Sequence, residues 1–453
     1  MTKLSITELR ASFNNRVITL GDAEYDKART VFYGGIDRYP AAIIRVANAV
    51  DASKVISLAR ENDLELAVRS GGHSNAGHSV TEGGIVLDLS RMRGLEINTK
   101  ENTAWVEPGM TAGEYTIATG VHGLTTGFGD TGSVGIGGIT LGGGVGYLVR
   151  KYGLTIDSLL SAELVTADGQ ILNVDEKNHP DLFWAIRGGG GNFGVATRFK
   201  FQLHEVDKVY GGMLTLPATP EVIASFIAEA ESAPEELSAI ANIMSAPPMP
   251  FLPPEAHGKL IIMGMLIYAG DASIGERVLA PFRKLATPLA DMIKPMSYPE
   301  IYLPEQEEYH PVAAGRTMFV DQVDRSVAEI ILNRLQASNA SMAVTQLRVL
   351  GGAMARVPVD ATAFAHRKSK IMANLAALYQ QPDEKETHEA WVNEFAKTIQ
   401  QSDKGAYVNF LADVDEAQVR AAYPGSTWER LCQIKIKYDP TNLFHLNQNI
   451  TSS

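Results

Sequence analysis

The stretch AVRSGGHSNAGHS, residues 67–79, places two histidines in a glycine-rich loop directly after a short apolar run. Glycine lets the backbone approach another group closely, and an imidazole can act as a metal ligand, a base or a nucleophile. A zinc site on His73 and His78 is disfavoured, because no cluster of cysteines or histidines elsewhere would complete it. No metal site is therefore expected.

Glycine is concentrated in three clusters in the first half of the chain. Besides the pair at 71–72, glycine makes up eight of the 16 residues in 131–146 and five of the seven in 188–194. So many glycines lower the stability of the folded chain, so a structural or functional reason for them is expected. Either the clusters form tight turns in a β-rich domain, or their bare N–H groups cradle an anion such as a pyrophosphate. A P-loop is absent, and no convincing strand feeds residue 131 as a Rossmann fingerprint requires.

The elements around the first cluster read as a strand–helix–strand unit. The pattern predicts a strand over 41–46, a helix over 51–64 with Asp51 or Ser53 as its N-cap, and a strand over 65–70. A hairpin is expected around Asp168-Gly169.

The pattern of apolar and polar residues changes near Lys208. Helical patterns then alternate with strand-like runs, which predicts an antiparallel sheet covered by helices on one face. The helices are expected over 220–232, 324–338 and 387–401, the strands over 258–270 and 343–352, a proline-rich loop over 245–258, and a final helix before a turn at Asp439-Pro440.

Composition narrows the classes of protein. The 453 residues suffice for two domains, and the net charge of −12 argues against a general nucleic-acid binder. The single cysteine, Cys432, permits no internal disulfide. No window is long and apolar enough for a membrane span, and the N-terminus lacks a signal-peptide core, so a cytoplasmic protein without a membrane partner is expected.

Four motifs occur in series: RSGGHS, GSVGIGGITLGGGVGYLVRKYGLTIDSL, DLFWAIRGGGGNFGVATRFKFQLH and IKIKYDPTNLFHLNQNI. Together they resemble the berberine bridge enzyme-like flavoproteins, whose FAD-binding fold is of the vanillyl-alcohol oxidase type. The resemblance spans about residues 35–450. It implies an α+β fold, with a PCMH-type FAD-binding domain of two subdomains plus a substrate domain built on an antiparallel sheet. The implied boundaries are 1–207 for the FAD-binding domain, 208–408 for the substrate domain, and 409–453 for a segment that returns to the first.

The resemblance implies FAD as the cofactor, bonded covalently through His73. A second, cysteinyl link of the family would fall at Thr131, and Cys432 lies in the expected C-terminal helix, so a single link is expected. His78 either faces the flavin or is a solvated loop residue. The implied cofactor-binding set is Arg69, Ser70, Gly71, Gly72, His73, Ser74, His78, Thr131, Gly132, Ser133, Gly135, Gly137, Gly138, Gly142, Gly143, Gly144, Tyr147, Asp157, Gly191, Asn192, Gly194, Val195, Asn447 and Asn449.

The catalytic residues are less plainly marked. The resemblance implies that Val134 leaves room for dioxygen, whereas bulkier residues there are associated with dehydrogenases. Two tyrosines of plant members are replaced by Asn75 and Val145. The lysine and glutamine sites of the family are placed at about Ala373 and Leu375, which predicts an apolar pocket.

The segment AYVNF, residues 406–410, is expected to be a strand with Tyr407 and Asn409 on one face. Tyr407 is the candidate base, and a buried structural tyrosine is the alternative.

These features predict an FAD-dependent oxidase that takes a hydride from a small organic substrate to flavin N5 and reduces dioxygen to hydrogen peroxide. The substrate could be an alcohol, a lactol, an amine or a polyketide intermediate. A flavin dehydrogenase with another acceptor and a non-catalytic FAD-binding module remain alternatives, and the oligomeric state stays open.

Overall fold

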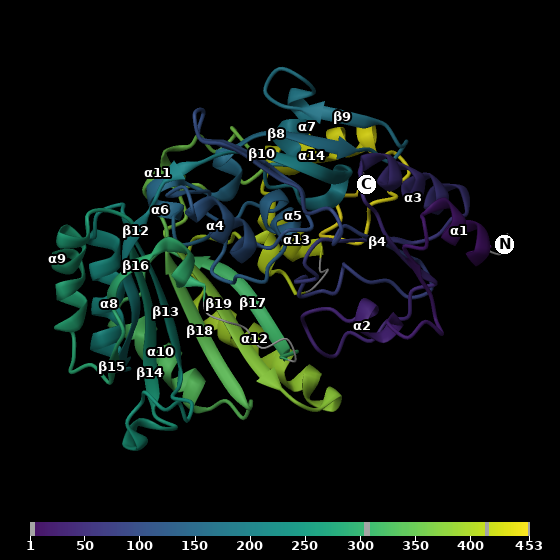
Figure 1. Cartoon of the computed structure of the whole chain (residues 1–453). Helices are drawn as coiled ribbons and strands as arrows, with labels where there is room; N and C mark the ends of the chain where they lie inside the picture. The colour runs from purple at the N-terminus through teal and green to yellow at the C-terminus, as the bar shows by residue number, and fades with distance from the viewer. Residues whose placement is uncertain (1–4, 303–308, 413–415, 452–453) are drawn as a thin grey trace.

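The computed structural model describes residues 5–302, 309–412 and 416–451 (Figure 1). Near the N-terminus lies a four-stranded sheet of order β1-β2-β4-β3, in which β4 pairs in parallel with both β2 and β3. All four residues of β4 are buried, as is usual for a parallel strand covered on both faces. The strands are β1 (Val17–Ile18), β2 (Ala42–Arg45), β3 (Leu66–Arg69) and β4 (Ile85–Asp88), and the helices are α1 (Ile6–Ser12), α2 (Tyr25–Arg29) and α3 (Ala49–Glu61).

The strand–helix–strand prediction is confirmed with one change at the helix start. Helix α3 begins earlier than expected, and its N-cap is Asn48, whose side chain accepts a hydrogen bond from Asp51 N at 2.9 Å. Asp51 itself is buried and pairs with Arg16 at 2.7 Å, so it is not available as a cap.

A second sheet is antiparallel throughout and has the order β5-β6-β10-β8-β9. The hairpin expected at Asp168-Gly169 joins β8 to β9, and Gly169 has a φ of +85°, which glycine adopts without strain. The strands are β5 (Leu95–Asn98), β6 (Thr103–Val106), β8 (Leu159–Val165), β9 (Ile171–Val174) and β10 (Val195–Gln202), with the short pair β7 (Leu124–Thr125) and β11 (His204–Glu205). The helical segments are α4 (Ala112–Gly120), α5 (Ile136–Leu141), α6 (Val149–Tyr152), η1 (Thr155–Ser158), α7 (Pro180–Ala185) and η2 (Gly190–Phe193).

The third sheet has eight strands and is antiparallel, as predicted. Its main order is β15-β12-β14-β13-β18-β19-β17, and β16 pairs with β12. The strands are β12 (Lys208–Pro217), β13 (Leu237–Ser245), β14 (Leu260–Tyr268), β15 (Ala290–Asp291), β16 (Lys294–Ser297), β17 (Val312–Val320), β18 (Met342–Val349) and β19 (Ile371–Tyr379).

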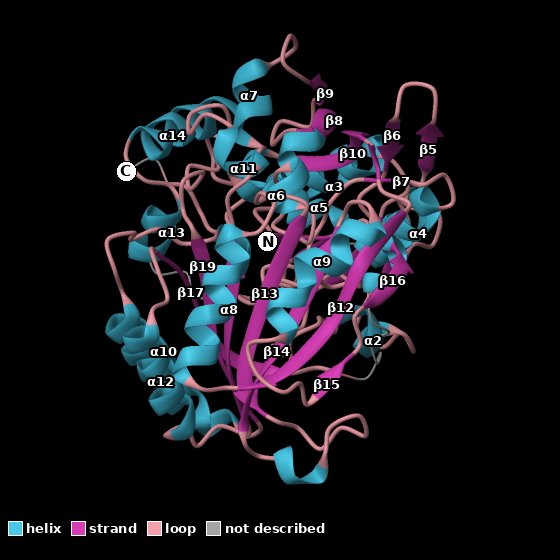
Figure 2. Cartoon of the chain, turned by 90° about the vertical axis from the view of Figure 1, so that its left-hand side faces the viewer, coloured by secondary structure: helices cyan, strands magenta, loops and turns pink. Residues whose placement is uncertain are grey.

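Helices cover one face of this sheet. Helices α8, α9, α10 and α12 contribute to one apolar core with its strands, and Figure 2 shows α8 and α9 in front of β13 and β12. The helices are α8 (Pro220–Ser232), α9 (Ala272–Arg283), α10 (Arg325–Gln336) and α12 (Lys385–Ile399), with shorter segments η3 (Pro254–Ala256), η4 (Tyr298–Ile301), α11 (Ala353–Arg356) and η5 (Pro382–Glu384). The opposite face points toward the glycine-rich half, because Val145 and Val149 share a core with Phe319 and Met372.

The segment 406–410 is not a strand. Residues Val408–Phe410 form the 3₁₀ turn η6, closed by a hydrogen bond from Phe410 N to Tyr407 O at 3.0 Å. These local bonds replace the ladder that a strand would need, so the prediction of alternating faces was wrong.

The C-terminal helices α13 (Glu416–Ala422) and α14 (Ser426–Tyr438) return to the glycine-rich half (Figure 1). The buried Lys435 ammonium donates to Asn192 O at 2.9 Å and pairs with Asp439 at 2.7 Å. Within the described ranges, no helix is long and apolar enough to span a membrane.

Candidate active site

A cavity of about 420 Å³ lies between the glycine-rich half and the eight-stranded sheet. Of the residues expected at the site, those that line it are Ser70, Gly71, Gly72, His73, Ser74, His78, Thr131, Val134, Gly135, Gly137, Gly138, Gly191, Gly194, Val195, Tyr407, Asn409 and Asn447. All three glycine clusters and the C-terminal segment therefore meet at one cavity.

The other expected residues lie outside the lining: Arg69, Gly132, Ser133, Gly142, Gly143, Gly144, Tyr147, Asp157, Asn192 and Asn449. Several of them support the walls. Arg69 donates to Ser79 O at 3.1 Å, and Asn192 donates to Gln448 O at 3.1 Å. Asp157 forms a buried bidentate ion pair with Arg367, with N–O distances of 2.7 and 2.8 Å, so its carboxylate is already committed.

His73 is held from two sides. Its ring stacks on Phe32, with centroids 4.2 Å apart and an interplanar angle of 19°. The Oγ of Ser133 lies 3.0 Å from His73 Nε2. These contacts fix the plane of the imidazole at the cavity wall, so its orientation is set before any ligand arrives.

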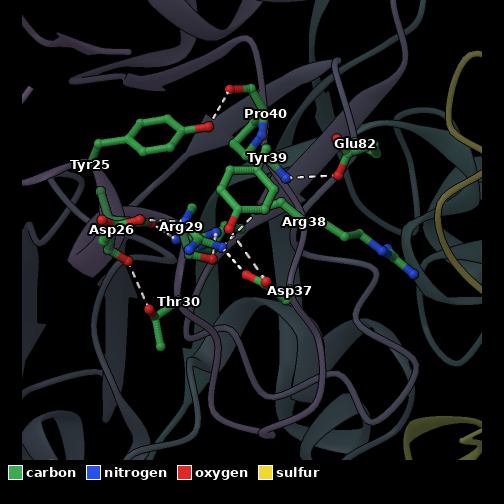
Figure 3. Close-up of polar contacts among 11 residues, drawn as sticks. Tyr25, Asp26, Arg29, Thr30, Asp37, Arg38, Tyr39, Pro40 and Glu82 are labelled. Atoms are coloured by element: carbon green, nitrogen blue, oxygen red, sulfur yellow. Dashed lines mark hydrogen bonds and ion pairs between the residues drawn. The ribbon is translucent and has the colours of Figure 1, made fainter. Parts of the chain in front are cut away.

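The segment that brings Phe32 to His73 is anchored by a polar cluster around Arg29 (Figure 3). The Arg29 guanidinium pairs with Asp26 at 2.8 Å and with Asp37, and it lies 4.0 Å above the ring centroid of Tyr39. Hydrogen bonding to the two carboxylates raises the pKa of Arg29, so the cluster remains ionised. The anchored segment also carries Tyr33, which lines the cavity; burial, with the nearby Asp130, raises the pKa of Tyr33 to about 12.

Two loops approach each other so closely that side chains are excluded. A Cβ atom added at Gly71 would collide with the backbone of Gly135, and one added at Gly135 would collide with Gly71 and with Ser70 Oγ. Glycine is therefore required at both positions to form this wall.

The wall presents hydrogen-bonding groups that the protein itself does not satisfy. The backbone N–H groups of Gly71, Gly72 and Ser74 donate to no acceptor in the described part of the chain. Buried polar groups are normally paired, so the buried Oδ1 of Asn447, which has no partner in that part of the chain, points to a missing ligand. The backbone N–H groups of a glycine loop are suited to bind a pyrophosphate. An unpaired acceptor is suited to a ligand that also carries hydrogen-bond donors, so FAD fits these donors and this acceptor.

His78 contributes to the same wall as a neutral group. Burial, with the Arg38 charge nearby, lowers the pKa of His78 to about 4. Its backbone N–H donates to Ser74 Oγ at 3.3 Å. A neutral imidazole does not supply a positive charge to a bound anion, so the backbone N–H groups are the groups that would bind an anion here.

Tyr407 also lines the cavity and is buried, with the residue 2% exposed. Its phenol oxygen accepts hydrogen bonds from Gly144 N at 3.0 Å, Val145 N at 3.3 Å and Asn409 Nδ2 at 2.9 Å. Burial raises the pKa of Tyr407, and the three N–H donors oppose that effect without overcoming it. Tyr407 is therefore a neutral phenol at pH 7, in a setting that would stabilise negative charge on its oxygen.

The sheet wall of the cavity is polar, not apolar as expected. Ala373 and Leu375 are fully buried in the core beneath the helices, on the far face of β19. Because side chains alternate along a strand, Asn374 faces the cavity, and Gln346 and Arg348 of β18 join it. The prediction was displaced by one residue, and strand alternation reverses the face at every such step.

Arg348 links the two walls. Its guanidinium pairs with Asp130 at 2.5 Å, donates to Gln346 Oε1 at 2.8 and 3.0 Å, and lies 5.2 Å from the ring centroid of Phe410. The Arg348 side chain is 5% exposed, and its charge is matched by one carboxylate. The sequence gives no local sign of this pair, since its partners are 218 residues apart.

Comparison with known proteins agrees with this arrangement. Residues 40–175 match the FAD binding domain family, and residues 406–451 match the family described as berberine and berberine like. The chain is 32% identical to the uncharacterized FAD-linked oxidoreductase YvdP of Bacillus subtilis strain 168, over 97% of this chain and 98% of that protein. It is 29% identical to (R)-6-hydroxynicotine oxidase of Paenarthrobacter nicotinovorans, over 97% of each chain.

The crystal structure of 6-hydroxy-D-nicotine oxidase from Arthrobacter nicotinovorans superposes with a TM-score of 0.85 at 27% identity, covering 96% of this chain and 98% of that one. The matches include proteins named as oxidases, and they extend over nearly the whole chain rather than the nucleotide-binding part alone. This protein is an FAD-linked oxidoreductase that belongs to the berberine bridge enzyme-like family.

Proposed function

We propose that this protein is an oxidase that binds one FAD through a single covalent bond to His73, oxidises a small organic substrate, and uses dioxygen as the electron acceptor. The observation that carries the proposal is the convergence of the three glycine clusters and His73 on one cavity, opposite a polar wall formed by the eight-stranded sheet. FAD, when bound, supplies a two-electron acceptor that takes a hydride at N5 and passes the electrons to dioxygen, giving hydrogen peroxide.

The geometry around His73 supports its role as the linking residue. Phe32 and Ser133 hold the imidazole in a fixed plane against the cavity, which favours attack on a single position of a bound ligand. A cysteinyl link has no support, because Thr131 lines the cavity and Cys432 lies on α14, outside the lining.

Tyr407 is the acid–base residue of the proposal. The two backbone N–H groups and the Asn409 amide around its oxygen would stabilise the phenolate that forms when Tyr407 gives up its proton. Asn409 also donates to Ile139 O at 3.1 Å, so the amide is fixed and its second N–H points at the phenol. This arrangement positions the oxygen of Tyr407, and the phenolate formed after the phenol has lost its proton to solvent is the species that would accept the substrate proton.

Val134 is the residue proposed to leave space for dioxygen. It lines the cavity between Ser133, which contacts His73, and Gly135, which contacts Gly71. The competing function is a flavin dehydrogenase that passes its electrons to another acceptor.

One experiment separates the two functions. The purified yellow protein is reduced anaerobically with one equivalent of dithionite and is then mixed with buffered oxygen in a stopped-flow spectrometer. The oxidase proposal expects the flavin absorbance to return as a function of oxygen concentration, with one hydrogen peroxide per flavin. A reduced flavin that persists in air but is reoxidised by an artificial acceptor would establish the dehydrogenase instead.

A further inference from the structure

A row of polar side chains crosses the sheet at the cavity wall. Asn242 of β13 is the register partner of Gln346 of β18, Gln346 is the partner of Asn374 of β19, and Asn374 is the partner of Thr317 of β17. Register partners on neighbouring antiparallel strands point to the same face of a sheet. The four side chains therefore form one band on the face that lines the cavity.

Most of this band is committed to internal hydrogen bonds. Asn242 donates to Met263 O at 3.2 Å, and Gln346 Nε2 donates to Asn242 Oδ1 at 2.8 Å. Gln346 Oε1 accepts both the Nε and Nη2 hydrogens of Arg348, and Arg348 also pairs with Asp130. Both ends of the Gln346 amide are thus used.

Asn374 is the exception. Its amide lines the cavity and has no hydrogen-bond partner in the described part of the chain, although Gln346 lies directly beside it in register. The hydroxyl of Thr317, its other register partner, is buried and likewise without a partner there. A half-buried amide with an unused donor and an unused acceptor is a hydrogen-bonding site for a ligand.

The charges at the cavity are already balanced. Among the described residues that line it, Asp130 is the one carboxylate and Arg348 the one permanently charged cation, and they pair with each other at 2.5 Å. Open groups of the cavity, among them the Asn374 amide and the Tyr33 phenol, are uncharged.

From this arrangement we infer that the substrate is an uncharged molecule with a hydroxyl group, an alcohol or a hemiacetal, and that Asn374 is the specificity-determining residue that binds this hydroxyl. The inference rests on the proposed function. An amide can donate to a hydroxyl oxygen and accept its hydrogen at the same time. An ammonium ion or a carboxylate that bound here would lose its hydration water and would meet no unpaired opposite charge in the cavity wall. The free-energy cost of desolvating an unpaired charge is large.

The test uses the flavin spectrum of the holoenzyme as a reporter of binding. Three ligands of matched shape are titrated at pH 7.5: benzyl alcohol, benzylamine (present as its ammonium ion) and benzoate. Benzyl alcohol should bind at least roughly tenfold more tightly than either ion. Asn374→Leu should weaken alcohol binding by about tenfold, the usual value of one hydrogen bond. Asn374→Asp should reverse the preference in favour of the ammonium ion.

Asn333→Asp is the matched control. Asn333 is an exposed residue of α10, and the substitution adds the same negative charge on the side of the sheet that faces away from the cavity. It should leave all three dissociation constants unchanged. Preference of the wild type for an ion, absence of binding by the alcohol, or an unchanged order in Asn374→Asp would overturn the inference. Failure of the proposed function would give a different result: the purified protein would contain no flavin, or its reduced flavin would not react with oxygen.

Discussion

Replacing Tyr407 by Phe removes one oxygen atom from the lining of the candidate site and keeps the aromatic ring. That oxygen is the acceptor for Gly144 N, Val145 N and Asn409 Nδ2. The ring also contacts Phe364 and Phe410 edge-to-face, with centroids 6.2 and 5.2 Å away, and those contacts should survive. The substitution therefore isolates the role of the hydroxyl.

The structure sets the size of both effects. Two buried backbone N–H groups lose their acceptor, whereas Asn409 keeps its bond to Ile139 O. Leaving a buried donor unsatisfied costs about 1–3 kcal/mol, so the free energy of unfolding should fall by roughly 3 kcal/mol in total. Loss of a general base should in addition slow flavin reduction by roughly 10²–10⁴-fold.

The assay is anaerobic single-turnover reduction of the flavin, measured as a function of pH beside a chemical denaturation curve. Because burial raises the pKa of Tyr407, the wild-type rate should still be climbing at pH 10, whereas the variant should lack that rise. Tyr115→Phe is the control: this buried tyrosine has its hydroxyl 3.0 Å from Thr126 Oγ1 and lies outside the cavity lining. A Tyr407→Phe protein that is destabilised but reduces its flavin at the wild-type rate would refute the catalytic role.

Three further outcomes are expected. Val134→Leu should slow reoxidation by oxygen while leaving flavin reduction by substrate unchanged, and equal reoxidation rates in stopped-flow traces would remove Val134 as the oxygen gate. Asp157→Asn should lower the free energy of unfolding by about 3–5 kcal/mol because it strands the buried Arg367 charge; Glu394→Gln, which breaks an exposed pair, should cost under about 1 kcal/mol in the same urea titration. Burial holds the pKa of His204 at about 4, below the unfolded value of 6.5, so protonation favours unfolding, and stability should fall as pH drops from 6.5 to 4. His204→Gln should remove up to roughly 3 kcal/mol of that loss, and an unchanged pH slope would contradict the assignment.

Local pattern predicted much of this fold. The apolar periods of α8, α10 and α12 and the turn at Gly169 depend on neighbouring residues, and the structure has each of them where the sequence indicates. The helix α3 was predicted in the right place, but its start and its cap were not, because α3 begins at Ala49 and an ion pair between Arg16 and Asp51 removes one of the cap candidates.

The same distinction between local and long-range information holds for the residues of the candidate site. The loop that carries His73 is marked by its own residues, so it could be found without coordinates. Asn374 was missed because a one-residue error in position along a strand places the side chain on the opposite face. The Asp130–Arg348 pair joins segments far apart in the chain and leaves no local signature.

The segment at 406–410 illustrates a third limit. Its alternating apolar and polar residues are typical of a strand, yet it pairs with no strand in the described part of the chain, and its backbone instead forms hydrogen bonds within a 3₁₀ turn. Tyr407 and Asn409 still meet, at 2.9 Å, but the turn brings them together rather than a shared strand face.

The most direct test of the account is the fate of the flavin when the protein is unfolded. Purified protein is precipitated with acid, washed, redissolved in denaturant, and examined by absorbance and by intact mass. The account predicts that the yellow colour stays with the polypeptide, that the mass rises by one FAD, and that His73→Ala carries none covalently while Cys432→Ser is unaffected. Flavin released into the supernatant by the wild type, or retained covalently by His73→Ala, would contradict it.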